Sequence, residues 1–406
     1  MSKFSLHVEE TLVKHGYRKF NMALLNKDEI MYYGPDGPTL RLGSALFLFY
    51  NTDDNDYWYV DFNHGPHLVD VKLFMPIDIM EKIRNGEVIL ILNNSHEAFH
   101  DPVEYIYQYF VEELKFPPKQ IRLLSESATI GDEIQRVAKK YNSDTIHADW
   151  LRIFEYNVSR SLYNLDYRKL NTLAIKDYDK KFLNLNRRWR KHRPMLVGLL
   201  HLNNLLDQGY VSFANNVDGE NWDGIWSFID HYAKDIKGTE LYTLLTENKD
   251  ILESIPTSYL DTPKLHINQV QVDNGLDYFY ENSYFSIVNE TNYFKEMGEG
   301  IFLSEKVFKP VLKMHPFILA SRPYSMRKFS ELGYKTFSPY IDESYDIEED
   351  DSKRLLMIVE ETKRLCNLTK DELERFLIGC KDICEYNYQI LAEKKFDQKS
   401  YITPLI

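Results

Sequence analysis

The chain has 406 residues, of which 44% are hydrophobic and 14% aromatic, and its formal net charge is −13. This length and composition support one large or two medium domains, and the presence of only three cysteines excludes a disulfide scaffold and fits a reducing compartment. The negative charge disfavours non-specific nucleic-acid binding over the whole surface, although a local basic groove or an anionic small-molecule ligand stays compatible with it. No apolar run approaches the length of a membrane span and the N-terminus lacks a signal-peptide core, so we expect a cytoplasmic protein with no membrane partner, in the host cytoplasm if the protein is viral.

The first eighty residues are rich in aromatic and turn residues and predict short strands. These strands are expected at residues 40–42, 45–50, 57–60 and 69–73. The acidic tip Asp53-Asp54-Asn55-Asp56 predicts a hairpin loop between the second and third of them. Asp54 and Asp56 could hold a divalent ion, but a solvated turn is favoured because Asp and Asn dominate such tips.

A Rossmann-like α/β unit is expected from Gly86 onward. The unbroken Val88-Ile89-Leu90-Ile91-Leu92 run is typical of a buried strand, and Asp101-Pro102 is typical of a helix start. The expected elements are strands at 88–92, 121–124 and 145–147 and helices at 103–114 and 130–141.

The α/β alternation resumes after a charged connector at 160–180 and predicts a second such unit. Its expected elements are strands at 182–186 and 210–213, a helix at 194–206, further alternation over 284–346, and C-terminal helices at 352–366 and 370–395. Residues 215–280 are mixed and acidic and predict no clear element. The fold class is therefore α/β, with two Rossmann-like domains, 1–175 and 176–406, facing a central cleft, and with C-terminal helices.

The segment His96-Glu97-Ala98-Phe99-His100 matches the H-E-x-x-H pattern of zinc hydrolases. That pattern needs the middle of a helix, whereas here it follows a strand directly and Pro102 comes two residues after the second His. A different interpretation places His96 or Glu97 at a strand's carboxyl end as a catalytic base, and a third makes His96 a simple helix cap. Cys380 and Cys384 are expected to be buried apolar residues, and no metal site is predicted.

The run Arg187-Arg188-Trp189-Arg190-Lys191-His192-Arg193 is strongly basic in an acidic chain. It lies at a strand-to-helix junction, where cations oppose the helix dipole, and such an arrangement hints at an anionic ligand. Arginine can grip a diphosphate through two hydrogen bonds at once, although a solvated basic helix start remains the alternative.

A third group of polar residues follows two apolar runs of the second half. Asn289, Glu290 and Thr291 end the run that begins at Tyr284, and Ser304-Glu305-Lys306 opens a helix. Because ligands of parallel sheets sit at strand carboxyl ends beside helix N-termini, these residues are candidates for a binding site.

These residues resemble a known group of enzymes. The stretch Phe285-Ser286-Ile287-Val288-x-Glu290-Thr291, Ser304-Glu305-Lys306-x-Phe308-Lys309-Pro310, Pro316-Phe317-Ile318 and Gly333-Tyr334-Lys335-Thr336-Phe337 resembles the donor half of fucosyltransferase-like and exostosin-like glycosyltransferases. The segments 184–193 and 93–97 are similar to those of uncharacterised phage-type glycosyltransferase-like proteins. The resemblance implies the two-Rossmann GT-B architecture and an inverting reaction without a bound metal or other cofactor.

The resemblance also implies roles for individual residues. Lys306 would contact the diphosphate of a UDP- or GDP-sugar, with Arg187 and Arg193 beside it and Ser304 at the helix start. Glu290 and Glu305 would hold the ribose or the sugar, and His96 or Glu97 of the acceptor-side half would deprotonate the acceptor hydroxyl. The acceptor is left open by these residues: a glycan, a protein or a hydroxymethylated base in phage DNA. The competing hypotheses are a zinc-dependent hydrolase that uses His96, Glu97 and His100, and a non-catalytic sugar-nucleotide-binding module.

Overall fold

The structure is a computed structural model of the whole chain. It describes residues 18–20, 31–33, 47–51, 56–61, 77–94, 102–163, 169–186, 189–213, 224–258, 260, 276–294 and 300–394. The chain forms two compact units: the first comprises Met1–Ile153, Met297–Gly300 and Asp397–Ile406, and the second comprises Phe154–Glu296 and Ile301–Phe396. The domain boundary predicted after residue 175 stays a prediction. Within these described stretches, no helix is both long enough and apolar enough to cross a membrane.

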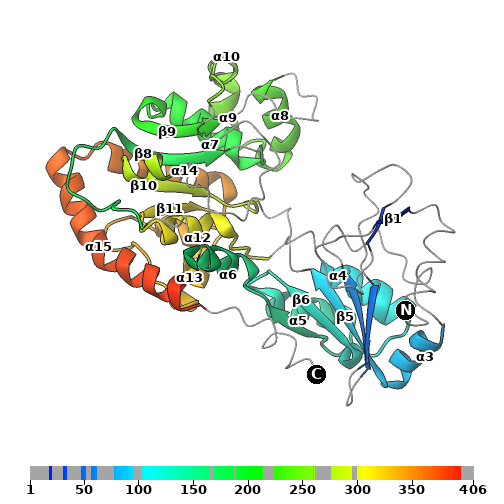
Figure 1. Cartoon of the computed structure of the whole chain (residues 1–406). Coiled ribbons are helices and arrows are strands. Elements are labelled where there is room, and N and C mark those ends of the chain that lie inside the picture. The colour runs from blue at the N-terminus through cyan, green and yellow to red at the C-terminus, as the bar shows by residue number, and fades with distance from the viewer. Residues whose placement is uncertain are drawn as a thin grey trace. The chain divides into compact units, whose positions relative to one another are not determined.

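The first unit contains a five-stranded sheet in the order β3-β4-β5-β6-β7 (Figure 1). Its strands are β3 (Phe47–Asn51), β4 (Asp56–Asp61), β5 (Val88–Asn94), β6 (Ile121–Ser125) and β7 (His147–Trp150). The hairpin predicted around the acidic tip is confirmed, because β3 pairs antiparallel with β4, while the other neighbours pair in parallel. A separate antiparallel pair joins β1 (Arg18–Phe20) and β2 (Met31–Tyr33). Asp54 and the strands expected at 40–42 and 69–73 lie outside the described residues.

Helices pack on one face of this first sheet. They are α3 (Ile77–Asn85), α4 (Pro102–Tyr105), its π-helical continuation η2 (Ile106–Glu113), the 3-10 turn η3 (Pro118–Gln120) and α5 (Ile130–Lys140). Leu90 and Leu92 of β5 and Leu123 of β6 are fully buried against this layer and form one continuous core with it. The strands and the helices near 103–114 and 130–141 are predicted by the sequence, but α3 is not.

The second unit contains a four-stranded parallel sheet in the order β9-β8-β10-β11. Its strands are β8 (Lys180–Asn186), β9 (Gly209–Phe213), β10 (Ser283–Asn289) and β11 (Phe317–Ala320). Every residue of β10 and β11 is buried, as expected for parallel strands covered on both faces. The strands predicted at 182–186 and 210–213, and the one beginning near Tyr284, are confirmed.

The helices of the second unit form layers on this sheet. In chain order they are α6 (Ile153–Arg160), η4 (Ser161–Tyr163), α7 (His192–Leu202), η5 (Leu206–Gln208), α8 (Ile225–Tyr232), η6 (Ala233–Ile236), α9 (Glu240–Glu247), α10 (Lys249–Glu253), α11 (Asp277–Glu281), α12 (Glu305–Leu312), α13 (Ser325–Glu331), η9 (Ser344–Ile347), α14 (Asp351–Cys366) and α15 (Lys370–Glu393). α7 packs against α14, whereas α12 packs against α15, which runs beside it in Figure 1.

The strand order of the second unit creates a topological switch point. From β8 the chain crosses through α7 to β9 on one side, and it later enters β10 on the other side of β8 and continues through α12 to β11. The two crossovers therefore run in opposite directions from the β8–β10 pair. In open α/β sheets the crevice at such a reversal, at the carboxyl ends of the strands, is where ligands bind.

Candidate functional site

The carboxyl ends of β8 and β10 lie side by side at this switch point. β8 ends at Asn186 and β10 at Asn289, and the two asparagine side chains are joined by a 2.7 Å hydrogen bond from Asn289 Nδ2 to Asn186 Oδ1. The carboxyl edge of the sheet therefore carries polar side chains in place of the apolar ones along the strands.

Ser304 begins α12 in the manner that its sequence predicts. Its backbone is extended and its hydroxyl accepts a hydrogen bond from the Lys306 backbone N–H, which is the geometry of an N-terminal cap. The confirmed helix start places Glu305 and Lys306 in the first turn, where the unsatisfied backbone N–H groups of a helix favour negative charge.

Glu290, the first residue after β10, fastens this helix start to the sheet. Its Oε1 accepts a 2.7 Å hydrogen bond from the Ser304 backbone N–H, and its Oε2 accepts one of 2.7 Å from the Ser304 hydroxyl and one of 3.1 Å from the Thr291 N–H. The side chain is completely buried, and this burial raises the pKa of Glu290 even though nearby Lys306 opposes the shift. Glu290 therefore acts as a positioning residue for α12.

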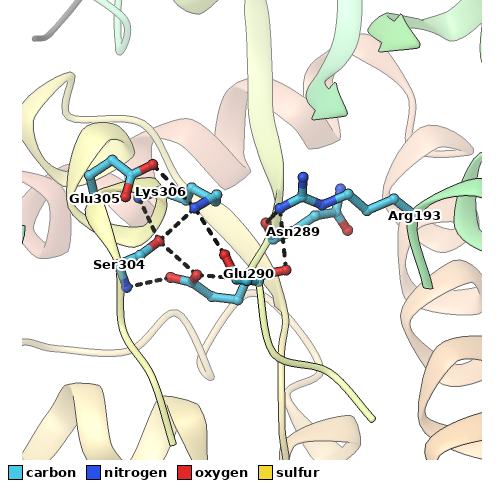
Figure 2. A network of polar contacts seen from close by, with 7 residues as sticks. Arg193, Asn289, Glu290, Ser304, Glu305 and Lys306 are labelled. Carbon is cyan, nitrogen blue, oxygen red and sulfur yellow. Dashed lines mark hydrogen bonds and ion pairs between the residues drawn. The ribbon is translucent and has the colours of Figure 1, made fainter. Parts of the chain in front are cut away.

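Lys306 presents its amine at the centre of the cluster (Figure 2). Nζ donates to Ser304 Oγ at 3.0 Å, to Glu305 Oε1 at 3.1 Å and to Thr291 Oγ1 at 3.3 Å. The Lys306 side chain is 29% exposed, whereas that of Glu305 is only 8% exposed, so Lys306 is the more accessible of the two residues. Burial tends to raise the pKa of Glu305, but Lys306 and Lys309 outweigh it and hold that pKa below its ordinary value.

Arg193, in the first turn of α7, donates hydrogen bonds to the backbone at the end of β10. Its guanidinium Nη2 donates to the backbone carbonyl of Asn289 at 3.0 Å and to that of Glu290 at 3.4 Å. Arg193 is 5% exposed, and Figure 2 shows its side chain reaching across to the strand end. Its contacts thus fix the backbone of the switch point, while Lys306 holds the more open position.

His192, the first residue of α7, receives no role of its own from the sequence. It is completely buried and its ring stacks on Tyr293, with ring centroids 4.7 Å apart and planes 19° from parallel. Burial lowers the pKa of His192 well below its ordinary value, and four surrounding cations lower it further: Arg193, Arg190, Arg354 and Lys306. The imidazole is therefore neutral and sits within a field of positive charge.

The structure brings together five of the predicted site residues, from three separate stretches of the chain. They are Arg193, Glu290, Ser304, Glu305 and Lys306. Arg187, His96, Glu97 and His100 lie outside the described residues. Over the described ranges, no group of three or more His, Cys, Asp or Glu side chains is arranged to hold a metal ion.

The arrangement is chemically suited to an anion. The positive end of the α12 dipole, a partly exposed Lys306 side chain on the same turn and the further cations around His192 all favour negative charge at one sheet edge. The carboxylates of Glu290 and Glu305 offset part of this positive charge, although the oxygens of Glu290 already accept from donors of the protein.

Comparison with known proteins gives a limited result. No family model and no curated protein matches the chain. Among solved structures, the chain is similar to a UDP-forming α,α-trehalose-phosphate synthase from Burkholderia xenovorans, with 10% sequence identity, 92% of each chain covered and a TM-score of 0.37.

Proposed function

We propose that this protein is a glycosyltransferase that moves a sugar from a nucleotide-diphosphate donor to an acceptor hydroxyl. The observation that carries the proposal is the partly exposed Lys306 side chain on the first turn of α12, at the switch point of the parallel sheet. Donor diphosphates are the kind of anion that such a helix start and cation would bind.

In this proposal the donor diphosphate lies against the N-terminus of α12. Lys306 contacts the phosphates directly, with Arg187 beside it, and it stabilises the charge that develops on the leaving nucleoside diphosphate. Glu290, Ser304 and Arg193 hold the helix start and the strand end in position for it. Glu305, which is hydrogen-bonded to Lys306, is the candidate partner for a hydroxyl of the donor.

The remaining parts of the proposal concern the reaction and the acceptor. His96 or Glu97 of the first unit takes the proton of the acceptor hydroxyl, which displaces the nucleotide in a single inverting step without a metal ion. The two units correspond to the two halves of a GT-B enzyme. The acceptor is a glycan or a hydroxymethylated base in DNA. Because the sequence resemblance to fucosyltransferase-like and exostosin-like enzymes motivates these features, each is a separate target for experiment.

A thermal-shift screen against UDP-, GDP- and other sugar nucleotides is the first test. A donor that binds the folded state raises the melting temperature by mass action, by an amount that grows with its concentration over Kd. The donor so identified is then incubated with the protein, and release of nucleoside diphosphate is measured. Binding with slow donor hydrolysis supports the proposal, whereas binding without any release, with or without glycan and hydroxymethylated-DNA acceptors, would identify a binding module instead.

A further inference from the structure

Two buried side chains at the switch point, in the part of the chain that the structure describes, have hydrogen-bonding atoms without a protein partner. Asn289 Oδ1 accepts no hydrogen bond, and neither Nδ1 nor Nε2 of His192 forms one. Asn289 is 2% exposed and His192 is fully buried, so bulk water does not reach either group freely. A buried polar atom left unpaired lowers stability, so two such side chains at one sheet edge are an unfavourable arrangement unless a ligand uses them.

The orientation of the Asn289 amide is fixed by a chain of three asparagines. Asn184 Nδ2 donates to the Ile287 carbonyl at 2.9 Å, and since a carbonyl can only accept, the Asn184 amide cannot be reversed. Asn184 Oδ1 then accepts from Asn186 Nδ2, and Asn186 Oδ1 accepts from Asn289 Nδ2. The direction of every step is therefore determined, and the chain ends with Asn289 Oδ1 as an acceptor at the carboxyl end of β10.

The His192 ring adds a second uncharged group near the same strand end. Its neighbour Arg193 donates to the Asn289 carbonyl, and the ring stacks on Tyr293, four residues beyond Asn289. A neutral imidazole offers one N–H donor and one acceptor nitrogen. A purely structural ring at this position would be served equally well by phenylalanine, which would bring no unpaired nitrogen atoms.

Asn289 Oδ1 and the His192 ring are suited to a different part of a ligand from the phosphates that Lys306 would contact. Phosphate oxygens at neutral pH are acceptors, so they cannot satisfy Asn289 Oδ1, whereas a hydroxyl can donate to it and accept from the imidazole. We propose that Asn289 and His192 bind hydroxyl groups of the donor, on its ribose or on the transferred sugar, next to the phosphate position of Lys306. This inference rests on the proposed function and names two further donor-binding residues for it.

The test is calorimetric titration of the full chain and two variants, His192→Phe and Asn289→Leu. The ligands are inorganic pyrophosphate, the nucleoside diphosphate that the wild type binds (UDP or GDP), its 2′,3′-dideoxy counterpart and the corresponding sugar nucleotide. Both variants should keep the wild-type affinity for pyrophosphate and bind the hydroxyl-bearing ligand roughly tenfold more weakly. If the variants lose affinity for the nucleoside diphosphate but not for its dideoxy counterpart, the recognised hydroxyl groups are those of the ribose. If they lose affinity only for the sugar nucleotide, the recognised hydroxyl groups are those of the transferred sugar.

His315→Phe is the matched control, because His315 is also a buried neutral histidine but has both nitrogens engaged. Its Nε2 lies 2.8 Å from the Ser283 carbonyl and its Nδ1 lies 2.8 Å from Ser286 Oγ, at the amino end of β10. His315→Phe should lower the melting temperature and leave ligand affinity unchanged, whereas His192→Phe should keep or raise the melting temperature by a few degrees and weaken binding.

The outcomes separate this inference from the proposed function. Wild-type protein that binds neither pyrophosphate nor any nucleotide overturns the proposed function and the inference together. Wild-type binding that His192→Phe leaves unchanged for every ligand overturns the inference alone, because a water-filled or structural role predicts that result. A loss of equal size for the dideoxy nucleotide also overturns the inference alone, since the recognised group would then be the base. Should Asn289→Leu fail to fold, His192→Phe decides.

Discussion

Replacing Glu290 with glutamine tests whether this carboxylate fastens α12 to the sheet. The substitution keeps the shape of the side chain but exchanges one oxygen for an amide N–H₂ group. The two carboxylate oxygens accept from different backbone N–H groups, Oε1 from Ser304 and Oε2 from Thr291. Whichever way the glutamine amide turns, its nitrogen faces a backbone donor, so one buried N–H group loses its acceptor.

The expected decrease in the free energy of unfolding follows from the loss of these hydrogen bonds. A hydrogen bond to a charged acceptor contributes about 1.5–3 kcal/mol, and a buried donor left without an acceptor costs about 1–3 kcal/mol. The raised pKa of Glu290 indicates that burying its charge is unfavourable, and removing that charge offsets part of the loss. We expect Glu290→Gln to lower the free energy of unfolding by about 2–3 kcal/mol at pH 7, or roughly 5–10 °C in melting temperature for a unit of this size.

The assay combines thermal unfolding with hydrogen exchange at the start of α12. Exchange of backbone amides, followed by mass spectrometry, should accelerate in Glu290→Gln for the peptide that contains Ser304 and the first turn of the helix. The neighbouring Glu305→Gln is the matched control, because Glu305 Oε1 accepts from the flexible Lys306 amine and glutamine can still accept there. Equal stability and equal exchange in the two variants would refute the assigned role of Glu290.

Three further predictions concern the second unit outside the site. Asp346 accepts from the backbone N–H groups of Met326 and Arg327 through different oxygens. In Asp346→Asn the amide nitrogen must face one of these N–H groups, so the substitution should destabilise α13 by about 1–3 kcal/mol in thermal unfolding. An unchanged melting temperature would contradict this prediction. Burial raises the pKa of Glu343 from 4.5 to about 7, so ionisation of this side chain opposes folding. Up to about 3 kcal/mol of stability should therefore be lost as the pH rises from about 4.5 through 7. Glu343→Gln should remove that loss at pH 8 and change little at pH 4, as followed by urea denaturation, and a parallel pH profile in both proteins would contradict it. Burial also raises the pKa of Cys366 to about 12 and raises the pKa values of Cys380 and Cys384, so a thiol reagent should label all three only on unfolding. Rapid labelling of the native protein would contradict their burial.

Local sequence signals predicted the elements that frame the site. The apolar run from Tyr284 predicted a buried strand, and β10 is buried along its whole length. Ser304 followed by Glu305 and Lys306 predicted a helix start, and α12 begins at Glu305 with Ser304 as its cap. Both signals depend on a few adjacent residues, so they can be interpreted without knowledge of the tertiary structure.

The contacts within the site could not be predicted in the same way, because they join distant segments. The oxygens of Glu290 accept from Thr291 and, fourteen residues later, from Ser304, while its expected role at a ribose or a sugar stays a prediction. The guanidinium of Arg193 reaches backbone carbonyls 96 and 97 residues along the chain, a contact that no local pattern indicates, while its expected place beside a diphosphate stays a prediction. Only the strand order, which places β8 next to β10, brings these groups together.

Short helices were the other feature that sequence periodicity missed. Residues 215–280 predicted no clear element, yet their described part contains α8, η6, α9 and α10, each of at most eight residues, and the start of α11 at Asp277. Such helices are shorter than the window of 11–18 residues over which helical periodicity is measured. α13 was missed for a different reason: its preceding residue, Tyr324, is left-handed with φ 66° and supplies no cap, and Asp346 caps the helix from twenty residues downstream.

The presence of a diphosphate site at the start of α12 is tested most directly by calorimetric titration of UDP and GDP into wild-type protein and a Lys306→Met variant. Lys363→Met is the control, because it removes the same charge from an exposed ion pair on α14 in the same unit. We predict that the wild type and Lys363→Met bind one of the two nucleotides equally, and that Lys306→Met binds it roughly 10–100-fold more weakly, since a charged hydrogen bond contributes about 1.5–3 kcal/mol. Equal affinity in all three proteins, or no binding of either nucleotide by the wild type, would contradict the account.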